Sequence, residues 1–200
     1  MPSMPPRRTC MNKQKKIALT GGPNSGKTTA LTILKETFGP QVELVREAAT
    51  MIFSGGFPRQ DNSPAHIEAA QKIIFVATRE MEALAEEYSK ADLIVCDRGT
   101  VDAAVYWPGG VVDFFKVMNT SLEKELARYD AVLHLSPPTN PDFYQSTHVR
   151  TENLDQAFEI DRKILDIWKE HPHRLIVEGK EHFFEKAEII KDFVEKIIKG

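Results

Sequence analysis

The segment Gly21-Gly22-Pro23-Asn24-Ser25-Gly26-Lys27-Thr28 constrains the fold of this chain more than any other feature. It fits the pattern G-x-x-x-x-G-K-[ST] and lies between an apolar β-type run at 16–20 and a helix-forming run at 29–35. The pattern requires this strand–turn–helix context, because glycines let the backbone curve around an anion and the helix N-terminus adds its positive dipole end. The sequence therefore predicts a loop that binds phosphate groups.

Each part of this loop has an expected role. Lys27 supplies a cation for the β- and γ-phosphates of a nucleoside triphosphate, and the Thr28 hydroxyl is suited to coordinate Mg²⁺. The alternative is a chance match in a glycine-rich turn, which the flanking strand and helix disfavour. The residues that we expect to bind the nucleotide here are Gly22, Pro23, Asn24, Ser25, Gly26, Lys27, Thr28 and Thr29.

Composition limits the class of protein. A length of 200 residues fits one domain, and a net charge of −3 disfavours binding to nucleic acid. No apolar run approaches the ~20 residues that a membrane span needs, and no apolar core follows the basic N-terminal residues, so we expect neither an anchor nor a signal peptide. We expect a disordered tail over 1–14 and one domain over 15–200. Cys10 and Cys96 are not expected to pair, which favours the cytoplasm.

Short apolar β-type runs alternate with helical patterns along the chain. The β-type runs span 16–20, 42–46, 93–96, 131–135 and 174–177, and the helical patterns span 26–37, 64–89, 122–129, 153–170 and 182–199. This alternation predicts an α/β fold with a mainly parallel sheet, whose ligands bind at the carboxyl ends of the strands. Three loops are expected to crowd that edge, at 54–61, 106–110 and 136–152.

Two residues that follow the third β-type run carry chemistry. Asp97 ends this run, and its carboxylate is expected to reach Mg²⁺ directly or through water. Arg98 comes next, and its planar guanidinium suits a phosphate or the acceptor. The alternative is that Asp97 caps the following helix and that Arg98 is its ion-pair partner.

Glu47 follows the second β-type run and faces the same edge. It is suited to accept a proton from an acceptor hydroxyl or to hold that hydroxyl in line with the γ-phosphate. The alternative is an acidic residue at a helix start, where the dipole favours it. Asp97 competes with Glu47 for the role of base. We expect one of the two to bind the metal and the other to act on the acceptor, and the sequence leaves the assignment open.

Further candidates lie in loops. Arg150 is expected to neutralise charge that develops on the γ-phosphate during transfer, and Arg59 and Arg162 are further candidates for such a contact. Gly179 and Lys180 follow the last β-type run, where they either contact the nucleotide base or form a simple turn into the next helix.

Aromatic residues and histidines receive separate interpretations. Trp107 either stacks on an acceptor ring or anchors its loop in the core. His171, His173 and His182 fit no metal-binding spacing and are expected at the surface.

The assembled motifs resemble the P-loop nucleoside- and nucleotide-kinase group. Within it, the chain looks most like the AAA-type ATPase domain shared by the nicotinamide-riboside-kinase part of NadR and by a eukaryotic trafficking protein that binds GTP and phosphoinositides. The motifs that carry this likeness lie at 21–28, 46–49, 54–58, 97–102 and 149–152, and the likeness covers about 15–199. It implies three layers, with a five-stranded parallel sheet in the order 2-3-1-4-5, helices on both faces, and a mobile lid between the fourth strand and the helix at 153.

The leading hypothesis is a phosphotransferase that uses ATP and Mg²⁺ to phosphorylate a small metabolite. Arg59 and Arg98 would bind the acceptor, with Trp107 as a further candidate, and Arg150 would close over the γ-phosphate. The alternatives are a nucleotide-dependent regulatory protein whose partner is a lipid headgroup or a protein, and a plain hydrolase. GTP stays possible, although the absence of an Asn/Thr-Lys-x-Asp guanine signature favours ATP. The sequence is compatible with a monomer or a homodimer.

Overall fold

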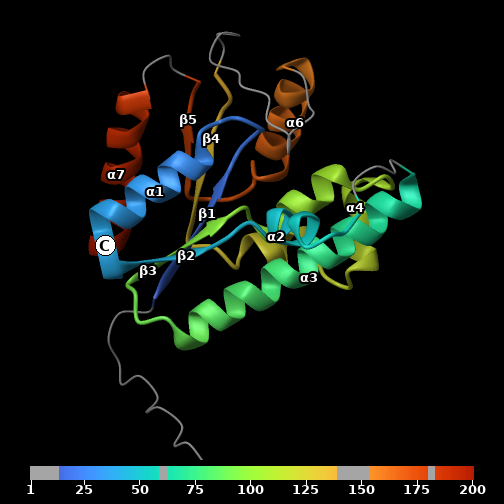
Figure 1. The fold of residues 1–200 in the computed structure, drawn as a ribbon, viewed down its shortest axis with the longest axis horizontal. Coiled ribbons are helices and arrows are strands. Elements are labelled where there is room, and N and C mark those ends of the chain that lie inside the picture. Colours follow the sequence, from blue (N-terminus) through green and yellow to red (C-terminus); the bar gives the residue numbers. More distant parts are fainter. Residues whose placement is uncertain (1–13, 59–62, 139–153, 180–182) are drawn as a thin grey trace, which may run out of the picture.

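The structure is a computed structural model that describes residues 14–58, 63–138, 154–179 and 183–200 (Figure 1). All but the last residue of the predicted tail lies outside the described residues. That last residue, Gln14, contacts the folded domain through a hydrogen bond of 2.8 Å from Nε2 to the carbonyl oxygen of Ala91.

Five parallel strands form one sheet in the order β2-β3-β1-β4-β5, which confirms the predicted fold class and strand order. Leu19, one residue from the end of β1, lies opposite Asp97 on one side and Leu133 on the other. The carboxyl ends of the central strands are therefore level, and the residues that follow them share one edge of the sheet. The strands are β1 (Lys15–Thr20), β2 (Val42–Val45), β3 (Leu93–Asp97), β4 (Ala131–Leu135) and β5 (Arg174–Val177).

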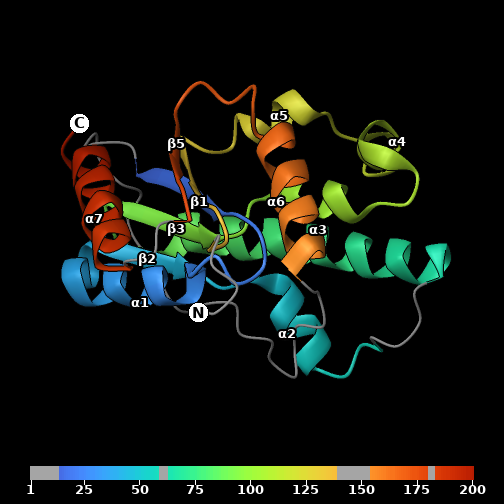
Figure 2. The ribbon, with the colours of Figure 1, turned by 90° about the horizontal axis from the view of Figure 1, so that it is seen from above.

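Helices cover both faces of the sheet (Figures 1 and 2). One face packs against α1 (Lys27–Phe38) and α7 (Phe183–Lys199), and the other against α3 (Pro64–Tyr88) and α6 (Leu154–Ile167). Strand alternation divides the core accordingly, since Ile17 and Leu19 belong to the first cluster and Ala18 to the second. The α3 side also holds η2 (Thr100–Tyr106), α4 (Gly110–Val117) and α5 (Leu122–Leu126).

Local signals explain where helices begin. The Ser63 hydroxyl accepts a hydrogen bond from the His66 N–H, and Pro64 takes the first position of α3, where a missing N–H has no cost. Four short elements were not predicted from the sequence, namely η1 (Gly39–Gln41), α2 (Ala48–Ser54), η2 and α4. Segments this short offer too few turns for a helical period to be recognised.

Glu82 of α3 is fully buried and binds three donors. It accepts hydrogen bonds from Lys16 Nζ at 2.9 Å, from Arg128 Nη2 at 2.6 Å and from the Tyr129 hydroxyl at 2.5 Å. The Tyr129 oxygen in turn accepts the N–H of Thr100 at 2.7 Å, at the start of η2. Burial, together with the charge of Glu82, raises the pKa of Tyr129 well above its usual value, so the phenol stays a donor. This network joins α3 to β1 and to the segment that carries Arg98.

The expectation that His171 lies at the surface is wrong. Its side chain is buried, because both ring nitrogens find backbone partners: Nε2 lies 3.0 Å from the Tyr129 carbonyl oxygen, and Nδ1 lies 3.2 Å from the His173 nitrogen. A neutral ring that donates through Nε2 and accepts at Nδ1 satisfies both contacts. His173 is exposed, as expected, and His182 lies outside the described residues.

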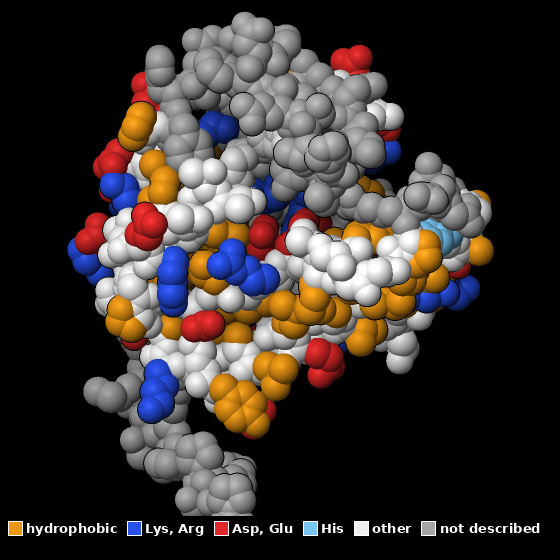
Figure 3. Space-filling model, viewed as in Figure 1, with side chains coloured by type: hydrophobic (Ala, Val, Ile, Leu, Met, Phe, Trp, Pro, Cys, Tyr) orange, Lys and Arg blue, Asp and Glu red, His pale blue; other side chains and the backbone are white. Residues whose placement is uncertain are grey.

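Apolar side chains that stay exposed gather along the outer side of α3, in the lower half of Figure 3. They include Ile73, Val76, Leu84 and Tyr88. In the part of the chain that the structure describes, no helix combines the length and the hydropathy that a membrane crossing requires.

We predict that Glu82→Ala lowers the free energy of unfolding by about 3 kcal/mol, because it leaves the buried Lys16 and the half-buried Arg128 without their shared carboxylate. Lys16 keeps a second partner in Glu86, at 2.6 Å, which limits the loss. Urea unfolding measures the change. Glu87→Ala, on the exposed side of the same helix, is the matched control and should cost less than about 0.5 kcal/mol. Equal losses in the two variants would show that the network does not stabilise the fold.

Candidate nucleotide-binding site

Residues 21–28 form a tight loop that joins the end of β1 to α1. Three residues of this loop have positive φ: Gly21 at 130°, Asn24 at 57° and Gly26 at 89°. Glycine is required at position 21, because a Cβ there would lie 1.9 Å from the Leu135 carbonyl oxygen. Since α1 begins at Lys27, the first N–H groups of the helix have no acceptor within it. Glycines and a helix N-terminus together form a site that suits phosphate.

Lys27 is buried within its own loop. Its Nζ donates to the carbonyl oxygens of Gly21 at 2.9 Å and Gly22 at 2.7 Å, and to the Ser25 hydroxyl at 3.1 Å. Its positive charge is near enough to Glu47 to lower the pKa of that carboxyl. The ammonium is therefore held within the loop by neutral oxygen acceptors.

The turn after β3 directs Arg98 across the edge of the sheet. Arg98 has a φ of 79°, which is unusual for a residue with a side chain. Its N–H donates to the Leu19 carbonyl oxygen at 2.9 Å, which ties the turn to β1. The next residue is Gly99, and only glycine fits there, because a Cβ would lie 2.4 Å from the Trp168 ring. An observed backbone outlier beside a phosphate loop is a mark of a functional site.

The Arg98 guanidinium joins the ends of three elements. Nη1 donates to the Gly21 carbonyl oxygen at 2.7 Å, Nε lies 3.2 Å from Glu47 Oε1, and Nη1 lies 3.7 Å from Asp102 Oδ2. Burial opposes the charge of Arg98, but Tyr106, Glu47 and the nearby aspartates outweigh it and hold its pKa above the ordinary value. Arg98 is therefore a permanent cation at this edge.

Glu47 is a half-buried carboxylate that immediately precedes α2. Burial raises its pKa, but the charge of Arg98, a hydrogen bond from the Thr50 hydroxyl and the charge of Lys27 lower the pKa by more. The net shift is downward, so Glu47 is ionised at neutral pH. Its position is compatible with both of our interpretations, the residue at a helix start and the proton acceptor.

Thr28 and Asp97 supply the oxygen atoms expected to hold Mg²⁺. Thr28 is exposed in the first turn of α1, and Asp97 is half-buried at the end of β3, level with Leu19. A hydroxyl and a carboxylate fit Mg²⁺, which prefers oxygen ligands and keeps several waters. Within the described residues, no group of three or more His, Cys, Asp or Glu side chains forms a metal cage.

Asp161 of α6 belongs to the site, and our sequence analysis missed it. Its Oδ1 accepts the Gly22 N–H at 2.7 Å and lies 2.9 Å from His134 Nε2. A charged residue within the buried stripe formed by Ala157, Ile164 and Trp168 is the signal that could have revealed it.

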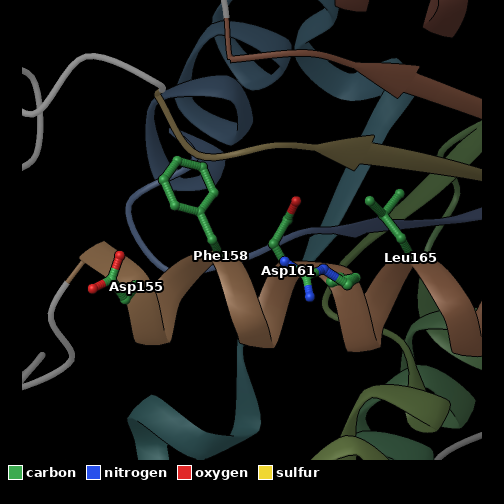
Figure 4. A pocket seen from close by; sticks show the side chains of 5 residues that line it. Asp155, Phe158, Asp161 and Leu165 are labelled. Carbon is green, nitrogen blue, oxygen red and sulfur yellow. The ribbon is translucent and has the colours of Figure 1, made fainter.

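The same residue lines a cavity of about 500 Å³ on α6 (Figure 4). The described residues around this cavity are Asp155, Phe158, Asp161, Arg162 and Leu165. Because Asp161 also binds Gly22, the cavity adjoins the phosphate loop. Its volume is typical of small-molecule sites.

Of the remaining candidate residues, the structure describes some and leaves others outside the described residues. Trp107 is buried, with its indole N–H donating to Asp113 at 2.7 Å and its ring packed edge-on against Phe114, which favours the loop-anchoring interpretation. A Cβ on Gly179 would lie 2.0 Å from the Pro137 carbonyl oxygen, so the turns after β4 and β5 are in close contact. Arg59, Arg150 and Lys180 lie outside the described residues, as does most of the expected lid between the fourth strand and the helix at 153.

Comparisons with known proteins agree with this geometry. A family model described as an AAA domain matches residues 16–186. Among solved structures, the deoxyadenosine kinase from M. mycoides with bound dATP superposes with a TM-score of 0.63 at 14% identity, covering 90% of this chain and 99% of that chain. At this identity the likeness concerns the fold. No curated protein matches the sequence. The narrower resemblance to NadR stays a prediction, and the chain belongs to the AAA domain family, with the fold of the P-loop nucleoside kinases.

Proposed function

We propose that this protein is a Mg²⁺-dependent phosphotransferase that moves the γ-phosphate of ATP to a small metabolite. One observation carries the proposal: a phosphate-type loop with its lysine and an ionised Glu47 held by Arg98 meet at the same edge of the sheet. A protein that only binds nucleotide has no need of a carboxylate positioned beside the phosphate site.

The loop and its surroundings would hold the nucleotide. The amides of residues 24–28 and the Lys27 ammonium neutralise the β- and γ-phosphates. Thr28 and Asp97 hold Mg²⁺, which when bound neutralises phosphate charge and fixes the phosphate geometry. In this proposal Gly179 and Lys180 would contact the base, and Arg150 would neutralise charge on the γ-phosphate.

Glu47 would act on the acceptor. The acceptor hydroxyl oxygen attacks the γ-phosphorus, the bond from that phosphorus to the β–γ bridging oxygen breaks, and the hydroxyl proton passes to Glu47 as ADP leaves. Arg98 keeps the carboxylate oriented and, with Arg59, contacts the acceptor. The cavity on α6 is the proposed acceptor space, because Asp161 in its wall also binds the phosphate loop at Gly22.

ADP release from Mg²⁺-ATP tests the proposal. We expect one member of a panel of nucleosides, nicotinamide riboside and sugars to stimulate release, and we expect Asp97→Ala to abolish that stimulation. The same assay with GTP in place of ATP shows which nucleotide is the phosphate donor. Tight nucleotide binding without stimulation by any acceptor would reject the kinase and favour a regulatory protein that recognises a lipid headgroup or a protein.

We predict that Lys27→Ala removes nucleotide binding or turnover, because the variant loses the cation that faces the phosphates. Titration with a fluorescent ADP analogue and steady-state turnover measure the effect. Lys163→Ala, an exposed lysine on α6, is the control and should behave like the parent. Unchanged affinity and turnover in Lys27→Ala would remove the loop from the proposed function.

We predict that Glu47→Gln leaves ATP affinity within a few-fold but slows transfer by ~10²–10⁴, the usual range for loss of a general base. Single-turnover transfer to the identified acceptor separates the two effects. Glu36→Gln, at an exposed position of α1, provides the control. Full transfer activity in Glu47→Gln would exclude Glu47 as the base.

We predict that Arg98→Met raises the pKa of Glu47, since burial then opposes its charge without the strongest compensating cation. NMR titration of ¹³C-labelled glutamate carboxyls measures the pKa, with Glu47→Gln identifying the signal. Because the folded-state pKa of Glu47 is lowered, its stabilising contribution is present above the unfolded-state pKa and is lost as the pH falls through the folded-state value.

Arg46→Met is the matched control, because Arg46 is exposed one residue before Glu47. If both variants leave the pKa of Glu47 where it is in the parent protein, Arg98 does not set its charge.

A further inference from the structure

The peptide unit between Gly21 and Gly22 is held at both of its polar ends. The carbonyl oxygen of Gly21 accepts from Arg98 Nη1 at 2.7 Å and from Lys27 Nζ at 2.9 Å. The N–H of Gly22 donates to Asp161 Oδ1 at 2.7 Å. The C=O and the N–H belong to one planar group, so partners on both sides prevent its rotation.

Asp161 reaches this peptide from a distant part of the chain and at close range. It lies 139 positions after Gly22, on α6, and is only 5% exposed. A Cβ on Gly22 would lie 2.9 Å from the Asp161 Cβ, so the helix approaches the loop as closely as a glycine allows. In Figure 4 the Asp161 side chain projects from α6 toward the side of the strands. Nothing in the G-x-x-x-x-G-K-[ST] pattern itself specifies this contact.

His134 of β4 and Lys186 of α7 surround the carboxylate. His134 is fully buried, and its Nε2 lies 2.9 Å from Asp161 Oδ1. Among the described residues its Nδ1 has no hydrogen-bond partner, so the contact with Asp161 is the hydrogen bond that the His134 side chain makes there. Lys186 is also buried and donates to the Ser136 carbonyl oxygen at 3.0 Å. Burial lowers its pKa, and the charge of Asp161 opposes that shift.

We propose that Asp161 is a positioning residue of the phosphate-binding loop and that His134 orients it. By fixing the Gly22 N–H, Asp161 keeps the Gly21 carbonyl directed at Lys27 and Arg98, and thereby sets both the curvature of the loop and the place of its lysine. The inference rests on the proposed binding of nucleotide by this loop. It assigns to α6 a role in phosphate binding, besides its place in the wall of the cavity.

Two substitutions at position 161 separate the hydrogen bond from its charge. Both partners contact Oδ1, so Asp161→Asn keeps an acceptor oxygen for them, whereas Asp161→Ala removes it. We expect Asp161→Ala to weaken the binding of Mg²⁺ and a fluorescent ADP analogue by about tenfold to a hundredfold. We expect the affinity of Asp161→Asn for the analogue to stay within about threefold of that of the parent, because the hydrogen bond alone maintains binding.

A control and a second pair of variants complete the series. Asp166→Asn makes the same chemical change at an exposed position of α6 and should leave affinity unchanged. His134→Gln keeps a side-chain N–H for Asp161 and should bind like the parent, whereas His134→Phe should weaken binding by about threefold or more. Thermal unfolding of every variant shows which ones are folded at the temperature of the titration.

Hydrogen exchange of the Gly22 amide provides a readout that does not depend on nucleotide. Labelling the 11 glycines with ¹⁵N simplifies the spectrum enough to follow this one N–H. We expect slow exchange in the parent protein and in Asp161→Asn, and faster exchange in Asp161→Ala, where the donor loses its acceptor.

The outcomes separate this inference from the proposed function. If the parent binds the ADP analogue and Asp161→Ala binds it equally well with unchanged Gly22 exchange, Asp161 does not position the loop. Equal losses in Asp161→Ala and Asp161→Asn would also overturn the proposal, because charge and not the hydrogen bond would then matter. If the parent binds no nucleotide, the proposed function fails, and the Gly22 exchange rates still decide whether Asp161 holds the loop.

Discussion

The ion pair between Arg98 and Glu47 is the interaction on which the rest of the site depends. It ties the turn after β3 to the start of α2, and the same guanidinium holds the Gly21 carbonyl of the phosphate loop. A residue with a side chain at a φ of 79° costs about 1–2 kcal/mol. The protein tolerates this conformation because two carboxylates and a carbonyl oxygen surround the guanidinium charge of Arg98. In addition, Gly99, the next residue, has no Cβ that would clash with the Trp168 ring.

Below this pair, buried polar contacts connect the phosphate loop and the end of β1 to the middle of α6 and to the residue that follows it. Asp102 of η2 accepts the Thr20 hydroxyl and the Trp168 indole N–H, each at 2.6 Å, and Asp161 accepts the Gly22 N–H. The loop is thus supported by a strand edge on one side and by a helix on the other. Hydrogen bonds with buried carboxylates are directional, so they define the loop more narrowly than apolar packing alone would.

Much of the fold was predictable from the sequence, because the strands and most helices produce local patterns of apolar residues. Apolar runs and helical periods located all five strands, the four longest helices (α1, α3, α6 and α7) and the short α5, and the resemblance supplied the strand order, which the structure confirms. The short helices α2 and α4 and the burial of His171 were not predicted. Each depends on contacts that form only after the chain has folded, such as the backbone partners of the His171 ring.

The candidate site was likewise predictable only where a local pattern marks its residues. The loop, Glu47, Asp97 and Arg98 were identified because each stands next to a predicted strand, and parallel strands bring such residues to one edge. Their chemical roles stay predictions. Asp161 and His134 escaped notice because no local pattern links either one to the loop. For Trp107 the loop sequence left a ligand contact and a core anchor both open, and the structure buries the ring in the core.

The position of Trp168 has a consequence for spectroscopy. The chain has two tryptophans, Trp107 and Trp168, and both belong to the apolar cluster on the α3 and α6 side of the sheet. Intrinsic tryptophan fluorescence therefore arises from one layer of the protein, while the α1 and α7 layer is silent. Trp168 is also joined to Thr20, the residue that precedes the phosphate loop, through the carboxylate of Asp102. Its emission is a built-in optical report on the packing beneath the loop, with no label attached.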